Sequence, residues 1–262
     1  MRPNNLRKIF AGGGTGLNGW LAIANTYSAE LMAHQGFDSV TIDLQHGPVD
    51  FGAAVGMLTA ISTTPAVPMV RVPHNEPILT LKLLDAGAYG VICPMINTRA
   101  QAETLVSYCR YPPLGSRSFG PNRAVLYAGS DYWQHANQEV LLFAMVETRE
   151  AVDNLDDIVS VEGIDGVYVG PSDLSMSLGK TPSLDPDDTD VLAAMKRIRE
   201  GTRRRGKIVG VHTDGAKTGI RRIAEGFQLC SILNDVRLMA MAASAQVREV
   251  RGGLPQAAPK TY

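Results

Sequence analysis

The chain has 262 residues, 45% of them hydrophobic, and its formal net charge is −1 at pH 7. This composition suits a globular protein with a sizeable core, and the small charge gives no reason to expect nucleic acid or an anionic membrane as a partner. Three cysteines without a Cys-x-x-Cys pair argue against a disulfide framework, and no apolar run approaches the roughly 18 residues of a membrane span. We therefore predict a cytoplasmic location.

The first motif in chain order is Gly14-Thr15-Gly16-Leu17-Asn18-Gly19, which fits the G-x-G-x-x-G pattern of a dinucleotide-binding turn. Such a turn must follow a buried strand and open a helix, with an acid about 20 residues further on, a role that Asp43 would suit. Only Ile9-Phe10-Ala11 offers a preceding strand, whereas the residues from Gly19 to Ile23 themselves resemble a strand. An NAD(P)-dependent oxidoreductase is therefore kept only as a minor alternative.

A rhythm of strand followed by helix then continues to the end of the chain. Short apolar runs that stop at Gly, Pro or charged residues are typical of buried parallel strands. We expect strands within 19–23, 39–42, 66–70, 90–93, 141–146, 166–169, 208–211 and 227–233. We expect helices within 28–35, 51–61, 102–109, 191–198 and 236–243, a further helix that begins at Pro77, and a long loop over 111–123.

Eight strands alternating with helices in about 250 residues match the count and length of a TIM (β/α)8 barrel. No linker or shift in composition divides the chain, so we predict a single barrel domain over residues 1–262. A doubly wound sheet is the alternative, because spacing alone does not establish closure. In a barrel, one mouth would gather the polar residues that follow strands, which are Asn25, Asp43, His46, Arg71, Glu147 and Asp173.

Two carboxylates end neighbouring strands of this pattern. Glu147 follows the apolar run 141–146, and Asp173 follows Gly170-Pro171-Ser172 after the run 166–169. Because the carboxyl ends of parallel strands share one face, both acids are expected there. Two oxygen ligands with room for water or substrate suit a hard divalent cation such as Mg²⁺ or Mn²⁺. The alternative, two acids that merely favour helix N-termini, stays open from these residues alone.

Further polar residues follow the second and third predicted strands. Asp43 and His46 lie three positions apart, and a carboxylate beside an imidazole would prepare it as a general base. The alternative is a turn aspartate and an ordinary surface histidine. Arg71 needs an anion, either Glu147 or a substrate oxyanion, and would share the charge of an enolate formed from a 2-oxo acid. His212 follows the seventh strand without further support.

A collinear set of motifs runs from about residue 20 to residue 235. Its members are Asp43-Leu44-Gln45-His46-Gly47, Val70-Arg71-Val72, Leu83-Leu84-Asp85-Ala86-Gly87-Ala88, Pro94-Met95, Val146-Glu147, Glu162-Gly163-Ile164-Asp165-Gly166 and Gly170-Pro171-Ser172-Asp173-Leu174-Ser175. This set resembles the HpcH/HpaI aldolases. The resemblance implies a class II aldolase that uses Mg²⁺, Mn²⁺ or Co²⁺. The enzyme would reversibly cleave a 4-hydroxy-2-oxo acid to pyruvate, or a related 2-oxo acid, and an aldehyde through a metal-bound enolate.

The same resemblance implies roles for the residues at the strand ends. Glu147 and Asp173 would be the metal ligands, His46 with Asp43 the acid/base pair, and Arg71 the clamp on the enolate. It also implies a homo-oligomer, a hexamer built as a trimer of dimers, in which the last helix is exchanged between subunits.

Substrate binding is expected next to the second metal ligand. Gly170, Ser172 and Asp173 begin a helix whose backbone amides would hold the pyruvate carboxylate, and Trp20 is expected nearby. Two small molecules, a 2-oxo acid and an aldehyde, are thus the expected partners.

Two positions depart from the family pattern. Gln45 stands where the family often has Glu before the histidine, and Met145 where it often has Gln two residues before the first ligand. The first change removes a charge near the base, and the second removes a polar contact to the substrate. Enolate lyases of the citramalyl/malyl or macrophomate synthase type, and a non-catalytic 2-oxo acid binder, are therefore kept as alternatives.

Specificity for the aldehyde is expected to come from the loop 111–123, from residues near Trp20 and Asn25, and from a neighbouring subunit. Within the loop, Arg117 and Arg123 are candidates for binding a distal carboxylate, although loop arginines are more often solvated.

Overall fold

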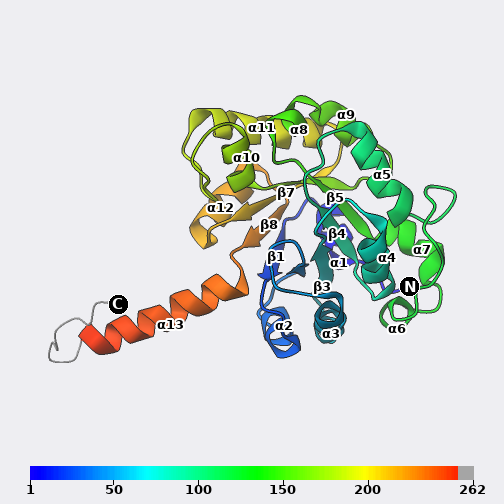
Figure 1. Ribbon diagram of the computed structural model, residues 1–262, viewed down its shortest axis with the longest axis horizontal. Coiled ribbons are helices and arrows are strands. Elements are labelled where there is room, and N and C mark those ends of the chain that lie inside the picture. Colours follow the sequence, from blue (N-terminus) through cyan, green and yellow to red (C-terminus); the bar gives the residue numbers. More distant parts are fainter. Residues whose placement is uncertain (253–262) are drawn as a thin grey trace.

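Eight parallel strands close into a barrel in the computed structural model, which describes residues 1–252 (Figure 1). Each strand pairs with the next, and β1 pairs with β8, with Gly16 opposite Leu229. The strands are β1 (Gly16–Leu21), β2 (Ser39–Asp43), β3 (Val67–Arg71), β4 (Gly90–Cys93), β5 (Leu141–Met145), β6 (Gly166–Val169), β7 (Ile208–Thr213) and β8 (Leu229–Ile232). The predicted TIM barrel is confirmed, because a doubly wound sheet would not close.

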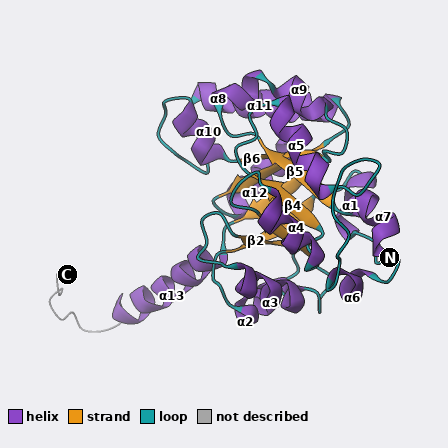
Figure 2. Cartoon of the chain, turned by 45° about the vertical axis from the view of Figure 1, so that its right-hand side comes forward, coloured by secondary structure: helices purple, strands orange, loops and turns teal. Residues whose placement is uncertain are grey.

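Helices surround the strands on the outside of the barrel (Figure 2). They are α1 (Asn5–Ala11), α2 (Thr26–Ala33), α3 (Phe51–Ile61), α4 (Pro77–Asp85), α5 (Arg99–Cys109), α6 (Ala124–Ala128), α7 (Tyr132–Glu139), α8 (Arg149–Asp153), α9 (Leu155–Ser160), α10 (Pro171–Ser177), α11 (Thr189–Arg204), α12 (Ala216–Glu225) and α13 (Asp235–Gly252). The last helix, α13, differs from the others because it points away from the barrel (Figures 1 and 2). No helix within residues 1–252 is both long and apolar enough to cross a bilayer.

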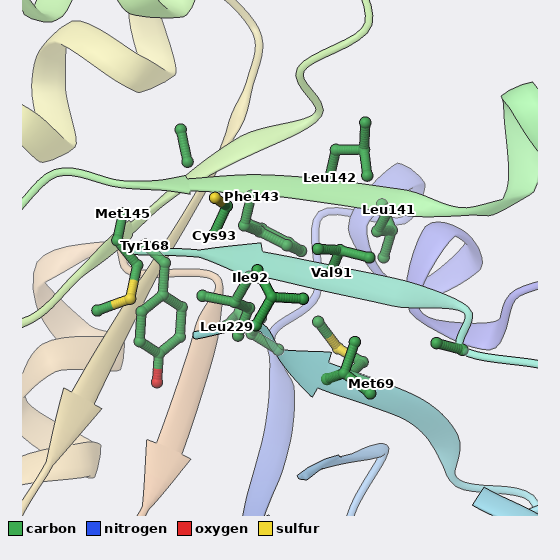
Figure 3. Close-up of a cluster of buried hydrophobic side chains, with 14 of the residues drawn as sticks. Met69, Val91, Ile92, Cys93, Leu141, Leu142, Phe143, Met145, Tyr168 and Leu229 are labelled. Carbon is green, nitrogen blue, oxygen red and sulfur yellow. The ribbon is translucent and has the colours of Figure 1, made fainter. Parts of the chain in front are cut away.

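The strands form where the sequence places apolar side chains on both faces. All residues of β2, β4, β5 and β6 are buried, as expected for a parallel sheet covered by helices on one side and filled by side chains on the other. Residues opposite one another in register share a face, so Met145 and Tyr168 point into the barrel together (Figure 3). These two side chains lie where the apolar cluster ends and the polar residues at the carboxyl ends of the strands begin.

The glycine-rich segment near the N-terminus does not form a dinucleotide-binding turn. Ile9, Phe10 and Ala11 belong to α1, a helix, and Gly16 and Gly19 lie inside β1. A fingerprint of this kind requires the glycines between a strand and a helix, in that order. The strand predicted at 19–23 overlaps β1. The minor alternative of an NAD(P)-dependent oxidoreductase is wrong, because the one motif that suggested it does not form a dinucleotide-binding turn.

Most predicted elements lie within a few residues of the observed ones. The helix at 51–61 and the strand at 90–93 have the predicted bounds, and α4 begins at Pro77 as expected. The crossover after β5 is two short helices, α8 and α9, that meet at Asn154, and two further helices, α6 and α7, follow the predicted long loop. Residues 253–262 of the predicted single domain lie outside the described residues.

Gly210 illustrates how tightly the barrel interior is filled. A Cβ atom at this position would lie 2.7 Å from Cδ2 of Tyr168 and 3.3 Å from the carbonyl oxygen of Leu229. Tyr168 is fully buried, so its ring has no space into which it can move. The small residue on β7 therefore makes room for the large one on β6.

We expect the substitution Gly210→Ala to lower the free energy of unfolding by about 1–3 kcal/mol because it overpacks the barrel interior. Urea titration monitored by circular dichroism measures the change. The control is Gly52→Ala in α3, where a Cβ atom would meet only Asp50 Oδ1, at 3.4 Å. This control is expected to be neutral or to stabilise by up to about 1 kcal/mol, since alanine favours a helix. An equal effect of both substitutions would contradict the packing argument.

Candidate active site

A cavity of about 250 Å³ opens where the strands end. Its walls come from strand ends and from the loops that follow them: Trp20, Asp43, His46, Arg71, Met145, Tyr168, Gly170, Ser172, Asp173, Leu184, His212, Leu233, Asn234 and Arg237. Seven of the eight predicted site residues line it, and Glu147 lies directly behind Gly170. The sequence prediction that polar residues after the strands gather at one mouth is thus confirmed for these positions.

Glu147 is held in a nearly closed compartment. Only 2% of its surface is exposed, and its Oε1 atom accepts a hydrogen bond of 3.0 Å from the backbone N–H of Met95. Met95 adopts a left-handed conformation, with φ of 56°, that is uncommon for a residue with a side chain. On the other side, a Cβ atom on Gly170 would collide with Oε2, so only glycine lets the loop after β6 approach the carboxylate.

The pKa of the Glu147 carboxyl is raised to about 7, chiefly by burial and also by the negative charge of Asp173, against the opposing effects of the Met95 N–H and Arg71. The two acids are therefore close enough to repel one another. A divalent cation would relieve both the repulsion and the loss of hydration. Oxygen donors of this kind suit Mg²⁺, Mn²⁺ or Co²⁺.

The protein alone provides an incomplete coordination shell. Among residues 1–252, no group of three or more His, Cys, Asp or Glu side chains is arranged around one point. Magnesium-like ions are commonly bound by one or two carboxylates, with water and substrate oxygens completing the shell. The pair of Glu147 and Asp173 fits this pattern.

Asp43 forms a closed ion pair with Arg71 on the opposite wall. The Nε and Nη2 atoms of Arg71 donate to Oδ1 and Oδ2 of Asp43 at 2.9 and 2.6 Å, and Trp20 Nε1 donates to Oδ2 at 3.1 Å. The guanidinium also lies 4.8 Å from the centre of the Trp20 ring. Burial alone would raise the pKa of Asp43, but Arg71 outweighs it and holds the pKa below its usual range. Asp43 is therefore ionised at neutral pH.

The expected pairing of Asp43 with the imidazole of His46 takes a different form. Oδ1 of Asp43 accepts hydrogen bonds from the backbone N–H groups of Gln45 and His46, at 3.1 and 3.3 Å. Within the described residues, no hydrogen bond joins the carboxylate to the imidazole, because Arg71 and Trp20 already occupy its oxygens. Asp43 thus fixes the turn that carries His46, and the imidazole itself is exposed at the cavity. Arg71, for its part, has Asp43 as its anion rather than Glu147.

The start of α10 presents free backbone donors to the cavity. Gly170 is the N-cap, no side chain caps the helix, and Pro171 has no N–H group to satisfy. Ser172 and Asp173 follow in the first turn, and both line the cavity. Uncapped amides at a helix start favour a negatively charged group, as expected from the sequence.

Several lining residues escaped the sequence prediction or lacked support there. Leu184 belongs to the loop after α10, whereas Leu233, Asn234 and Arg237 follow β8 and begin α13. His212 lies at the end of β7, and only its position after the seventh predicted strand pointed to it. His212 and Asn234 directly follow predicted strands, and this position is the signal that could have identified them. Leu233 lies within the predicted strand 227–233 and Arg237 within the predicted helix 236–243, so neither carried such a signal.

Other candidates lie elsewhere. Arg117 is buried, donates to Asp85 Oδ1 at 2.7 Å and to the Tyr132 hydroxyl at 3.0 Å, and is therefore structural. Arg123 donates to the carbonyl of Ala86 at 2.6 Å and is likewise outside the cavity. Asn25 caps α2. The expectation that the two arginines bind a distal carboxylate within their own subunit is wrong.

The fold and its mouth define a barrel enzyme whose polar groups stand at the carboxyl ends of the strands, and comparison with known proteins narrows this class. A family model described as HpcH/HpaI aldolase/citrate lyase matches residues 17–238. A hydroxypyruvate/pyruvate aldolase from Rhizorhabdus wittichii is 43% identical over 248 residues, covering 95% of this chain and 99% of that protein. A 4-hydroxy-2-oxo-heptane-1,7-dioate aldolase from Escherichia coli is 34% identical over 245 residues, covering 92% and 93%.

Among solved structures, that of an HpcH/HpaI aldolase/citrate lyase family protein from Burkholderia cenocepacia J2315 matches with a TM-score of 0.89 at 31% identity, covering 95% of this chain and 100% of that one. The chain belongs to the HpcH/HpaI aldolase/citrate lyase family. The predicted family is confirmed, as is the prediction of a carbon–carbon lyase at the level of this family.

Glu147 should give the metal-free protein a pH dependence of defined sign. Its pKa is raised from 4.5 to about 7 in the folded protein, so the folded state binds this proton more tightly than the unfolded chain does. The resulting stabilisation is complete below pH 4.5 and is lost as the pH rises to about 7. Across this range we expect the free energy of unfolding of chelator-treated protein to fall by roughly 3 kcal/mol relative to the Glu147→Gln variant.

Urea titrations at several pH values measure this difference. Glu103→Gln serves as the control because Glu103 is an exposed residue in a surface ion pair, and it is expected to follow the wild type. Parallel curves for the wild type and the Glu147→Gln variant would show that Glu147 does not hold its proton more tightly in the folded state.

Proposed function

We propose that the protein is a divalent-metal-dependent class II aldolase that reversibly cleaves a 4-hydroxy-2-oxo acid to pyruvate, or a related 2-oxo acid, and an aldehyde. The observation that carries this proposal is the placement of two repelling carboxylates, Glu147 and Asp173, at the mouth of a family barrel, with Arg71 and His46 lining the same cavity. The names of the relatives support the substrate class, since both are aldolases acting on 2-oxo acids.

Glu147 and Asp173 would hold the metal ion. When bound, the ion supplies a Lewis acid that stabilises negative charge on the 2-oxo acid. Glu147 is suited to this task because, among the described residues, its only side-chain hydrogen bond is the one that Oε1 accepts from the Met95 N–H, and it forms no ion pair that would balance its charge.

The remaining polar groups would orient the substrate and move its protons. The free amides of Ser172 and Asp173 bind the carboxylate of the 2-oxo acid, while Arg71 shares charge on the oxo oxygen. The imidazole of His46 accepts the proton of the C4 hydroxyl group during cleavage and returns it during addition. Asp43 serves this reaction indirectly, because it holds both the Arg71 guanidinium and the turn at His46.

The two departures from the family pattern alter the surroundings of these groups and leave the groups themselves in place. Met145 lines the cavity with a thioether, a weak acceptor that cannot donate a hydrogen bond. Gln45 lies outside the cavity lining, and its Oε1 atom is buried without a hydrogen-bond partner among the described residues. An enzyme of altered substrate preference explains these changes better than a non-catalytic binder, because the proposed ligands and the base remain.

We also propose a homo-oligomer in which α13 is exchanged between subunits, and a cytoplasmic location. Val236, Met239, Ala243, Val247 and Val250 recur every three or four residues along α13 and are all exposed. In the chain described to residue 252, Asp235 is the only buried residue of this helix. An apolar stripe of this kind is suited to burial against another subunit. All three cysteines are buried and unpaired, which supports a reducing compartment.

The aldolase proposal predicts exchange of the methyl protons of pyruvate in D₂O, because enolate formation removes a proton from C3. With Mg²⁺, Mn²⁺ or Co²⁺ present, the wild type should exchange these protons, as followed by ¹H NMR spectroscopy. Glu147→Gln and Asp173→Asn should each lower the rate at least about 100-fold, whereas Glu103→Gln should leave it unchanged. The proposal fails if none of the three ions supports exchange, or if exchange survives both a chelator and Glu147→Gln.

The assembly proposal predicts that charges on the apolar stripe of α13 separate the subunits. The double substitution Met239→Asp and Val247→Asp should give a smaller species than the wild type in sedimentation velocity, since it buries two carboxylates at the interface. Met239→Leu is the matched control, because it keeps an apolar side chain and should retain the wild-type size. A monomeric wild type, or a double variant of unchanged size, would refute the assembly.

A further inference from the structure

His212 is a cavity residue to which the proposed reaction gives no task. It lies at the end of β7, opposite Ser231 of β8 in register, and its ring faces the cavity. One layer below it on the same strand is Gly210, which makes room for the ring of Tyr168. The imidazole therefore lies on a filled barrel interior and forms part of the cavity wall.

The orientation of the imidazole is determined by its neighbours. Its Nδ1 atom lies 3.3 Å from the hydroxyl of Tyr168, which in turn donates to Ser231 Oγ at 2.5 Å. Ser231 also accepts a hydrogen bond of 2.7 Å from Nδ2 of Asn18. The ring meets Trp20 edge-on, with 4.7 Å between ring centres and an angle of 88°. These contacts leave little freedom for the ring to turn.

The ring is uncharged at neutral pH. The pKa of His212 is lowered to about 4, chiefly by burial and also by the positive charges of Arg71 and Arg237, against the opposite effect of Asp43. A neutral imidazole has one ring nitrogen that donates and one that accepts. It is thus poorly suited to bind a carboxylate, which needs a cation or several donors.

One polar atom of this ring has no partner within the protein. Among the described residues, Nε2 makes no hydrogen bond. The atom is not fully buried, so it is open to the cavity. A hydroxyl group can both donate and accept, and it therefore matches Nε2 in either tautomer. A hydrogen atom or a methyl group in the same place would leave the nitrogen desolvated and unpaired.

We propose that His212 binds a hydroxyl group that the 2-oxo acid carries on its reacting carbon, C3, or that the aldehyde carries next to its carbonyl carbon, and thereby makes the enzyme prefer hydroxylated substrates to their deoxy counterparts. This inference rests on the proposed aldolase function. It assigns specificity to the wall formed by β7 and β8, whereas the two acids follow β5 and β6.

Two substitutions separate the hydrogen bond from the shape of the side chain. His212→Phe keeps an aromatic edge against Trp20 but removes the nitrogen, whereas His212→Gln keeps a polar group at the distance of Nε2. His212→Leu gives the same readout as the phenylalanine variant should the larger ring fail to fit. Metal-dependent exchange of pyruvate protons should persist in all three variants.

The readout is the ratio of kcat/KM values within matched pairs of substrates. In one arm, hydroxypyruvate and pyruvate are compared as donors with a common aldehyde. In the other, glycolaldehyde and acetaldehyde are compared as acceptors with pyruvate. We expect His212→Phe to lower the preference for the hydroxylated member about tenfold in one arm, and His212→Gln to retain most of it. The arm that changes identifies which half of the substrate carries the hydroxyl group.

Unchanged ratios in both arms, or equal losses in the phenylalanine and glutamine variants, would overturn the assignment of His212. If the wild type exchanges pyruvate protons while these ratios stay unchanged, only this inference fails and the proposed function stands. If the wild type shows no metal-dependent exchange, the proposed function fails and the inference is overturned with it.

Discussion

The mouth of this barrel depends on the repulsion between a buried carboxylate, Glu147, and an exposed one, Asp173. The Glu147 carboxylate is nearly inaccessible to water and is repelled by Asp173. The chain maintains this arrangement with an uncommon backbone conformation at Met95 and with a glycine at position 170 that lets the next loop close over the acid. A cation bound between Glu147 and Asp173 would offset the cost of the backbone strain at Met95 and of the burial of Glu147.

On the facing wall, charge is balanced within the protein. Asp43 and Arg71 stand opposite one another in the register of β2 and β3, and the resulting ion pair is completed by Trp20. Arg71 therefore enters the cavity as a rigid donor whose charge is partly neutralised, and the imidazole of His46 is left free to meet a ligand. One side of the cavity carries the acids Glu147 and Asp173, and on the other side the charge of Asp43 is balanced by Arg71. Such a cavity favours ligands that carry a cation or bind one.

The elements were predictable from the sequence because apolar runs that end in polar residues mark parallel strands, and the strand at 90–93 and the helix at 51–61 have the predicted bounds. The gathering of Glu147 and Asp173 followed from the same rule. The partner of Asp43 could not be predicted, because it depends on the register between β2 and β3. The spacing of residues along the chain does not reveal that register. In the same way, Arg117 looked like a solvated loop residue, but it pairs in the interior with Asp85.

The division of the cavity between two sets of strands has a consequence for how specificity arises. The groups assigned to bond cleavage follow β2, β3, β5 and β6, whereas His212, Leu233 and Asn234 come from the end of β7 and the segment after β8. In a barrel each loop is held by its own strand, so residues on one arc of the mouth can differ without displacing those on the other. If the two arcs vary independently, relatives of one family can act on different 2-oxo acids, as the names of two relatives of this chain indicate. On the second arc, the neutral His212 would therefore alter which substrate is preferred and leave the reaction itself unchanged.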